Sequence, residues 1–459
     1  VVVCPPAVWS PALSWSSSVH LIFHVLTASR RWSPEQPSMN TSSILCTAAF
    51  VVVAGAAPVR AQVEPSAPLS LQEALELSGR NSPELRMARR RLRVALGQAR
   101  QGRAIPNPTA SITNEDLGPY SERYVNLSQR LDFVWEGGSK GRRSEARASE
   151  ARGVFQADSA RIALEVKRAY VDAWQQARVV LALSEVDGVV AEVLDDARAR
   201  FAEGDLAGYD LRRLRVARAS MGRRLIRADV SLAGAERTLG SLVSGDASVP
   251  RVRPGAALDV AALPSALVAD VDAIERALAS RPELAAARSA TEALDAEASL
   301  ARTSILSGTA ITGGFKQQSD GRAGLFLGLE LPIPVLDRRG GAIDAAVAEV
   351  DRSQSELDLL RVVIAREASL ADSRLAGARR QQALLGDSGI EQAAQLLSIA
   401  RVAYDEGEVG IVELVDAADA FLEARLLASS VRAELWIAFH ELEYAIGGFP
   451  REAETGAER

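Results

Sequence analysis

The chain has 459 residues, of which 24% are charged and only 5% are aromatic, and its formal net charge is −6 at pH 7. Arginines are interleaved with acidic residues, so the clustered positive surface that phosphate binding requires is missing, and nucleic acid is excluded as a partner. Abundant Ala, Leu, Arg and Glu are typical of long packed helices.

The first 61 residues differ from the rest. Residues 1–38 hold three of the six Trp and one of the two Cys, and we interpret them as an upstream over-extension that is not native. Residues 39–61 combine an apolar run with small residues before a cleavage point, which predicts a secretory signal peptide, with an uncleaved anchor as the alternative. The exported chain then has no Cys, which excludes disulfides and thiolate metal sites.

Beyond residue 61 the chain repeats itself at a period of roughly 200 residues. Residues 200–205 return in similar form at 403–408, and residues 82–85 return at 281–284. A period of this length indicates a duplicated domain rather than a solenoid. We therefore predict a first structural repeat, a Pro- and Gly-containing linker, a second repeat and a disordered C-terminal tail, at residues 62–245, 246–270, 271–448 and 449–459.

The first repeat is predicted to be mainly helical. Leucines near helical spacing predict a helix from Leu69 to about Ile105. After Gly137 and Gly138, apolar residues step by three or four as far as Phe201, with Arg and Glu outside the seam. Roughly 65 residues at 1.5 Å each would form a rod about 100 Å long.

The second repeat predicts a similar rod. It begins after Gly340 and Gly341 and runs to Tyr404, with a local irregularity at residues 386–389. The two rods end at Gly204 and Gly407, where a left-handed C-cap would let the chain reverse into another helix. Each repeat is therefore expected to end in a helical hairpin tip.

Each repeat also contains two segments with the alternation of β-strands. In the first repeat these segments are 109–114 and 124–131, and in the second they are 309–315 and 324–331. Their apolar residues would share one face, which we expect to contact lipid. The predicted lipid-facing residues are Val125, Leu127, Leu325, Leu327 and Leu329.

Membrane insertion is one of two interpretations of these strands, since soluble hairpins show the same alternation. No run of 18 or more apolar residues follows Ala61, so a membrane-spanning helix is not predicted. Four strands cannot close a barrel, and open edges are not tolerated in lipid. The membrane interpretation therefore requires several chains, and three would pool about twelve strands, an even number as in bacterial barrels.

The segment from Tyr404 to Ala417 resembles the corresponding segment of the outer-membrane efflux protein family typified by TolC. Residues 127–129 and 137–143 further resemble the heavy-metal and multidrug efflux subgroup. The resemblance covers residues 69–448. It implies a fold that is mainly α with a small β part: a long α-helical hairpin barrel plus four strands per chain in a 12-stranded trimeric transmembrane β-barrel.

The same resemblance implies functional residues. Glu413 and Asp416 fall on the acidic positions that line the narrowest ring of the tunnel, while Tyr404 and Asp210 fall on positions of the network that holds the tips shut. Residues i and i+3 share a helix face, so threefold symmetry would gather about six carboxylates around one axis, a site that favours cations. The alternative is a solvated acidic face near a helix start. The best-known member of the family has a basic residue two positions after the motif glycine, whereas this chain has Val409 there. Which contact keeps the tip closed is therefore left open.

No catalytic residue, metal site or cofactor is predicted. Residues 386–389 spell a serine-protease-like tetrapeptide, but a nucleophile needs a base, and His440 is the only His after residue 61. A lone His in an apolar helix is more often packed than bound to zinc, which requires three or four ligands. An enzyme is therefore the least favoured class.

The leading hypothesis is a passive outer-membrane exit duct, a homotrimer whose helical tunnel lies in the periplasm. By resemblance, a periplasmic adaptor would dock at the hairpin tips near Gly204 and Gly407, and an inner-membrane pump would supply energy. The alternative is a soluble periplasmic coiled-coil scaffold or adaptor, which predicts that residues 325–331 pack in a protein core. The cargo stays open among metal ions, drugs and proteins.

Overall fold

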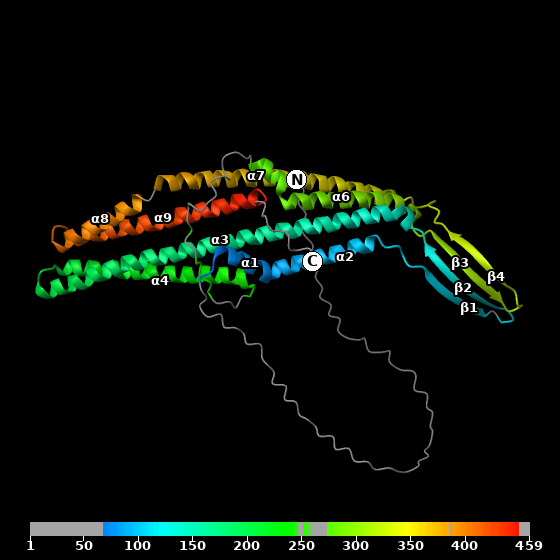
Figure 1. Ribbon diagram of the computed structural model, residues 1–459, viewed down its shortest axis with the longest axis horizontal. Coiled ribbons are helices and arrows are strands. Elements are labelled where there is room, and N and C mark those ends of the chain that lie inside the picture. Colours follow the sequence, from blue (N-terminus) through cyan, green and yellow to red (C-terminus); the bar gives the residue numbers. More distant parts are fainter. Residues whose placement is uncertain are drawn as a thin grey trace, which may run out of the picture. The chain divides into compact units, whose positions relative to one another are not determined.

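The computed structural model describes residues 68–116, 118–246, 251–255, 258, 273–385 and 388–448. These residues belong to one compact unit, Gln62–Arg459. The predicted upstream extension, signal peptide and C-terminal tail lie outside the described residues, as does most of the predicted linker. The described part is mainly helical with one small sheet (Figure 1).

Two helices, rather than the single one predicted, precede the sheet: α1 (Leu71–Asn81) and α2 (Pro83–Gly102). Ser70 and Glu73 form a reciprocal capping box at the start of α1. The prediction of one helix is wrong because Pro83 lacks an N–H and disfavours helical backbone in the residue before it. Ser82 accordingly has ψ of 122° and caps α2 through its side chain.

The long helix of the first repeat is α3 (Phe133–Glu203), followed by α4 (Gly208–Ser244). The 71 residues of α3 correspond to about 105 Å. Gly137 and Gly138 lie inside α3 instead of before it, because backbone bonds from Val134 to Leu131 and from Glu136 to Asp132 already start the helix.

The second repeat contains several helices in addition to the long one that was predicted. They are α5 (Ala273–Ser280), α6 (Pro282–Thr303), the 3-10 turn η3 (Ser304–Leu306), α7 (Gly340–Leu385), α8 (Ser388–Asp405) and α9 (Ile411–Ala445). The predicted rod is thus divided into α7 and α8, and Gly386 and Asp387 between them lie outside the described residues.

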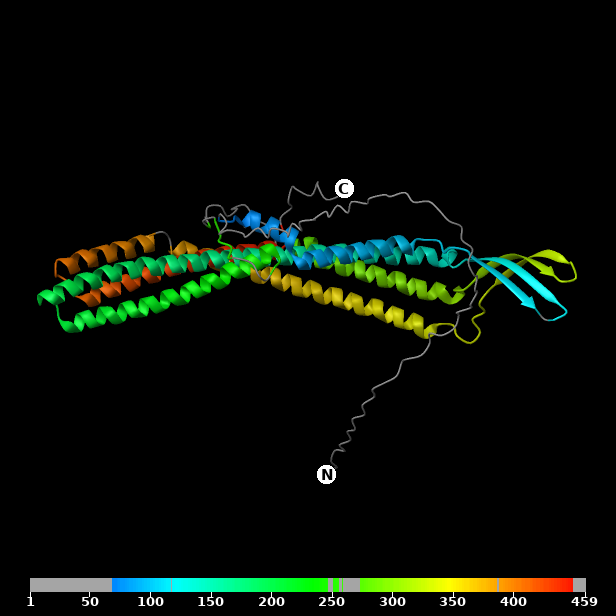
Figure 2. The ribbon, with the colours of Figure 1, turned by 90° about the horizontal axis from the view of Figure 1, so that it is seen from below.

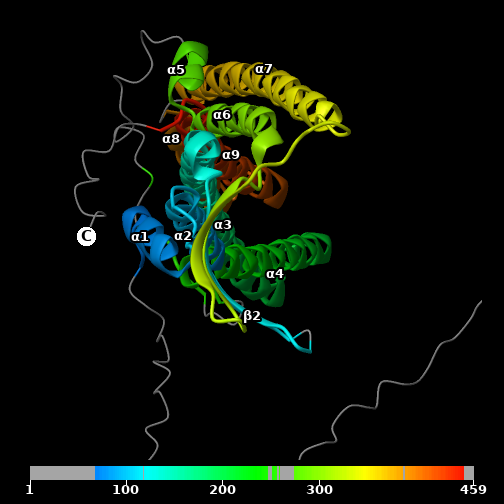
Figure 3. The same ribbon diagram turned by 90° about the vertical axis from the view of Figure 1, so that its right-hand side faces the viewer.

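The predicted strands are confirmed. They are β1 (Thr109–Asp116), β2 (Ser121–Arg130), β3 (Ala310–Gln318) and β4 (Ala323–Glu330). They form one antiparallel sheet in the order β1-β2-β3-β4. Because β2 pairs with β3, the two repeats contribute to one sheet, which Figure 3 shows from its end.

The helices run lengthwise between the sheet and the helical hairpin tips (Figure 2). α3 contacts α2 and α6 toward the sheet and α4 and α9 toward the tips. The cores are thin and lie between these helices, and one of them contains Tyr170, whose hydroxyl donates to the Leu69 carbonyl at 3.0 Å. None of the described helices has an apolar stretch long enough to cross a membrane.

Candidate functional site

The register of the sheet gathers the apolar residues of all four strands on one face. Residues paired across antiparallel strands point to the same side, and successive residues alternate. One cross-strand row consists of Ile112, Val125, Phe315 and Leu325, and the next of Ala110, Leu127, Gly313 and Leu327. Leu325, Leu327 and Leu329 are 88%, 77% and 68% exposed. A single copy therefore presents a large apolar surface to its surroundings.

The opposite face of the sheet is polar. Thr312 donates to Ser128 at 3.0 Å, and Lys316 pairs with Glu122 at 3.0 Å. The same Lys316 ammonium lies 5.1 Å from the centroid of the Tyr124 ring. The two faces of the sheet therefore differ in polarity.

Both lateral edges of the sheet are open. β1 and β4 each have only one neighbouring strand within the described part of the chain. An edge strand presents a row of unpaired N–H and C=O groups that can pair with another strand. The four strands therefore have the form of a barrel segment with two complementary ends.

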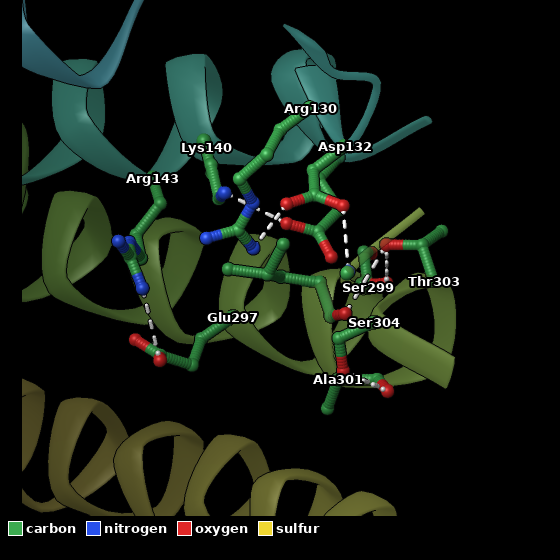
Figure 4. A network of polar contacts seen from close by, with 12 residues as sticks. Arg130, Asp132, Lys140, Arg143, Glu297, Ser299, Ala301, Thr303 and Ser304 are labelled. Atoms are coloured by element: carbon green, nitrogen blue, oxygen red, sulfur yellow. Dashed lines mark hydrogen bonds and ion pairs between the residues drawn. The ribbon is translucent and has the colours of Figure 1, made fainter. Parts of the chain in front are cut away.

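A polar network joins the sheet to the helices (Figure 4). Asp132, at the junction of β2 and α3, has a side chain only 3% exposed that pairs with Arg130 and accepts the Gly308 N–H at 2.8 Å. One turn later, the buried Glu136 pairs with Lys140 at 2.7 Å. Because Gly308 leads into β3, Asp132 connects the start of α3 to the second pair of strands.

At the other end, two hairpin tips lie together (Figures 1 and 2). Gly204 and Gly407 have φ of 90° and 78°, the left-handed backbone for which glycine is favoured. The tip of α3 and α4 and the tip of α8 and α9 share one apolar cluster, which Val409 also joins. The two tips are therefore packed against each other within one copy.

The predicted gate residues lie at these tips. Glu413 is in the first turn of α9 and Asp416 follows on the same side; both are exposed, and neither forms an ion pair with another described residue. Asp210 lies in the first turn of α4 and is half-buried. It forms no ion pair with Arg212 or Arg213 in the described part of the chain.

Tyr404 occupies the boundary between the tips. Its side chain is only 4% exposed, and its hydroxyl has no hydrogen-bond partner among the described residues. Burial raises the pKa of Tyr404, and the negative charge of Asp210 acts in the same direction, against that of Arg200. The structure thus brings Tyr404 and Asp210 near each other without a hydrogen bond between them.

Sequence reasoning missed Arg200. Its guanidinium lies 5.2 Å from the centroid of the Tyr404 ring and reaches backbone carbonyls at the end of α8. A comparison of the repeats could have indicated it, because the position that corresponds to Arg200 in the second repeat is Ala403. An arginine in only one copy of a duplicated tip breaks the symmetry.

His440 is buried in α9 beside Trp436 and Phe439. Its Nδ1 lies 3.2 Å from Glu443, which also accepts from Lys167 of α3 at 2.5 Å. Burial lowers the pKa of His440, against the opposing effect of Glu443. Although burial acts in the opposite direction, His440 and Lys167 lower the pKa of Glu443 to about 2.

Comparison with known proteins shows what this chain is similar to. Residues 273–448 match the family model "Outer membrane efflux protein". The cobalt-zinc-cadmium resistance protein CzcC of Cupriavidus metallidurans is 25% identical over 390 residues, which cover 84% of this chain and 91% of CzcC. The chain is thus similar to outer membrane efflux proteins over most of its length. These similarities indicate an outer-membrane protein of the efflux-channel kind rather than an enzyme, with its helices in the periplasm.

Solved channels share the fold of this chain. The Campylobacter jejuni CmeC outer membrane channel superimposes with a TM-score of 0.69 at 17% identity, covering 82% of this chain and 85% of CmeC. CusC superimposes with a TM-score of 0.68 at 17% identity, covering 83% and 92%. The described helices and four strands therefore have the fold of these channels.

In the described ranges, no group of three or more His, Cys, Asp or Glu is arranged to hold a metal ion. His440 has Trp436, Phe439 and Glu443 around it, which is the environment of a packed histidine. These surroundings do not fit a resident metal at this position.

Proposed function

We propose that this protein is a homotrimeric outer-membrane exit duct that passively conducts substrates from the periplasm to the exterior. The observation that carries the proposal is the four-stranded sheet with two open edges and one exposed apolar face. In three copies, β4 of each would pair with β1 of the next, giving about twelve strands and no edge. The apolar face would contact lipid and the polar face would line water.

The exposed leucines of β4 favour the channel over the soluble scaffold. The scaffold hypothesis requires residues 325–331 to pack in a protein core. Leu325, Leu327, Leu329 and Leu331 instead project from the described part of the chain, with the least exposed of them at 53%. An apolar surface of this kind marks an interaction site, and its regular alternation across four strands fits lipid.

The acidic pair on α9 supports a narrow, cation-attracting gate. Glu413 and Asp416 are three residues apart on α9 and exposed in one copy. Threefold symmetry would bring about six carboxylates to one axis if this face lines the tunnel. We propose that this ring is the constriction and that Tyr404 and Asp210 belong to the packing that keeps it closed.

We further propose that the duct works in a tripartite system. The hairpin tips near Gly204 and Gly407 would dock a periplasmic adaptor, and an inner-membrane pump would supply energy. The signal peptide proposed at residues 39–61 would deliver the chain to the periplasm. We propose divalent metal cations as the cargo, because CzcC is named for resistance to cobalt, zinc and cadmium and an acidic ring suits cations.

Two measurements test the duct. Outer-membrane fractions should contain a trimer that resists mild detergent and dissociates on heating, and the purified trimer should form pores in planar bilayers. A folded monomer that stays dispersed in buffer without detergent would overturn the proposal. For cargo, deletion of the gene should lower tolerance to zinc, cobalt or cadmium; unchanged metal tolerance with lowered drug tolerance would reject the metal assignment alone.

A further inference from the structure

Arg200 joins the ends of two helices. It lies in the last turn of α3, and its guanidinium reaches across to the last turn of α8. Nη1 lies 3.5 Å from the Tyr404 carbonyl oxygen and Nη2 lies 3.3 Å from that of Asp405. The Asp405 carboxylate is 4.0 Å away. One side chain therefore contacts the backbone, the ring and a carboxylate of the opposite tip.

The electrostatics of helix ends favour a cation at this place. The last four carbonyls of an α-helix lack intrahelical partners, and the C-terminus carries a partial negative charge. Gly407 and Glu408 donate their N–H groups back to Tyr404 and Ala403, and Arg200 adds donors to Tyr404 and Asp405. Arg200 thus lies at the negative ends of α3 and α8 together.

The aromatic contact adds to this attraction. The Tyr404 ring is buried, and a guanidinium over a desolvated ring is bound more strongly than one over an exposed ring. Because the Tyr404 hydroxyl has no partner in the described part of the chain, the contact depends on the ring and not on the hydroxyl. Phenylalanine could therefore replace Tyr404 in this role.

Other ion pairs between the two hairpins are more exposed to solvent and therefore contribute less to holding the hairpins together. Arg401 pairs with Glu192 at 2.5 Å and Arg425 with Glu185 at 3.1 Å. All four side chains are at least two-fifths exposed, so solvent and salt screen these pairs. Arg200 differs because its acceptors are helix-end carbonyls and a buried ring.

We propose that Arg200 fastens the tip of α8 and α9 to the tip of α3 and α4 within each copy and so holds the duct closed. Val409 packs in the apolar cluster of the tips and cannot provide the charge that the resemblance expects at its position. Arg200 supplies a positive charge from the opposite hairpin instead. This inference rests on the proposed duct function.

Conductance and a distance measurement test the latch. Arg200→Ala should raise the open fraction of trimers in planar bilayers by roughly tenfold, since one charge-assisted hydrogen bond contributes at least that factor. Spin labels on Glu203→Cys and Glu406→Cys, with Cys4→Ser and Cys46→Ser, should report a broader and longer tip-to-tip distance in Arg200→Ala than in the parent, in trimers diluted with unlabelled chains.

Matched variants separate the latch from a general disturbance of the tip. Arg198 pairs with Asp195 in its own helix at 2.6 Å, so Arg198→Ala should leave both readouts unchanged. Tyr404→Leu removes the ring that Arg200 contacts and should loosen the tip. If Arg200→Ala fails to assemble, the neutral Arg200→Gln takes its place.

The outcomes are distinct for the two proposals. Unchanged conductance and unchanged tip distances in assembled Arg200→Ala or Arg200→Gln would overturn the latch and leave the duct intact. A wild-type protein that forms no pores would overturn the duct, and the tip distances would still decide whether Arg200 fastens the hairpins. Equal effects of Arg198→Ala and Arg200→Ala would likewise reject the latch.

Discussion

Gly153 of α3 and Ala286 of α6 are in direct contact: a Cβ built on Gly153 would lie 2.8 Å from the Ala286 Cβ and 2.9 Å from its Cα. The two helices belong to different repeats, and they also carry the Arg143–Glu297 ion pair at 3.1 Å. Only glycine allows the helices to approach this closely. The contact therefore fixes the distance between α3 of the first repeat and α6 of the second.

Gly153→Ala is expected to destabilise the protein even though alanine favours helices. The backbone of α6 would have to move, and such overpacking costs about 1–3 kcal/mol. Gly188, also in α3, has nothing within 4 Å of a built Cβ, so Gly188→Ala should stabilise by roughly 0.5–1 kcal/mol. Thermal unfolding followed by circular dichroism measures both. Equal shifts of the same sign would contradict the close approach.

Much of the fold could be predicted from the sequence because its signals are local. Alternating residues such as Leu325, Leu327 and Leu329 revealed the strands, and Gly204 marked the end of a long apolar period. The boundary between α1 and α2 at Ser82 was missed because the leucine spacing continues across it, although Pro83 is a signal for such a boundary. The contact of Gly153 with Ala286 depends on which helices meet, and no local pattern contains that information.

The candidate site was predictable to a lesser degree. Glu413 and Asp416 were identified through a family resemblance, and their role at a constriction stays a prediction, since it depends on neighbouring copies. Arg200 was missed because its partners are mainly backbone carbonyls and a ring on another helix. Backbone acceptors leave no trace in side-chain patterns, so only the geometry of the tips brings this residue to attention.

The two faces of the sheet should differ in how well they tolerate an added charge. Leu327→Arg places a cation on the apolar face, where it costs about 2–4 kcal/mol near the middle of a bilayer. Ser111 lies on the opposite, polar face of β1, so Ser111→Arg should be tolerated. The yield of heat-dissociable trimer in outer-membrane fractions compares the two variants. Similar yields would reject the assignment of the apolar face to lipid.

Removal of the acidic pair should take negative charge away from the proposed constriction. The double variant Glu413→Ala and Asp416→Ala is expected to raise single-channel conductance and to weaken block by multivalent cations, because about six carboxylates would leave the proposed ring. Glu423, exposed on α9 two turns farther from the tip, provides the control, and Glu423→Ala should change cation block much less. Conductance and block like those of wild type would remove Glu413 and Asp416 from the constriction.

Acid should destabilise the helical body in two steps, the first of which depends on His440. Because burial lowers its pKa below 6.5, the unfolded chain binds the proton first, so stability is complete above pH 6.5 and falls as the pH drops below it. The pKa of Glu443 is lowered from 4.5 to about 2, so its contribution is present above pH 4.5 and is lost as the pH falls toward 2.

The His440→Gln variant separates these two steps. Its melting temperature should change less than that of wild type between pH 7.5 and pH 5.5, while the loss of stability below pH 4.5 should persist because Lys167 still pairs with Glu443. His20 and His24 precede the described residues, so removal of residues 1–38 leaves His440 as the one histidine of the chain. A His440→Gln protein with the same pH dependence as wild type above pH 5.5 would show that the imidazole titrates alike in the folded and unfolded states, and its burial beside Trp436 and Phe439 would then have no electrostatic consequence.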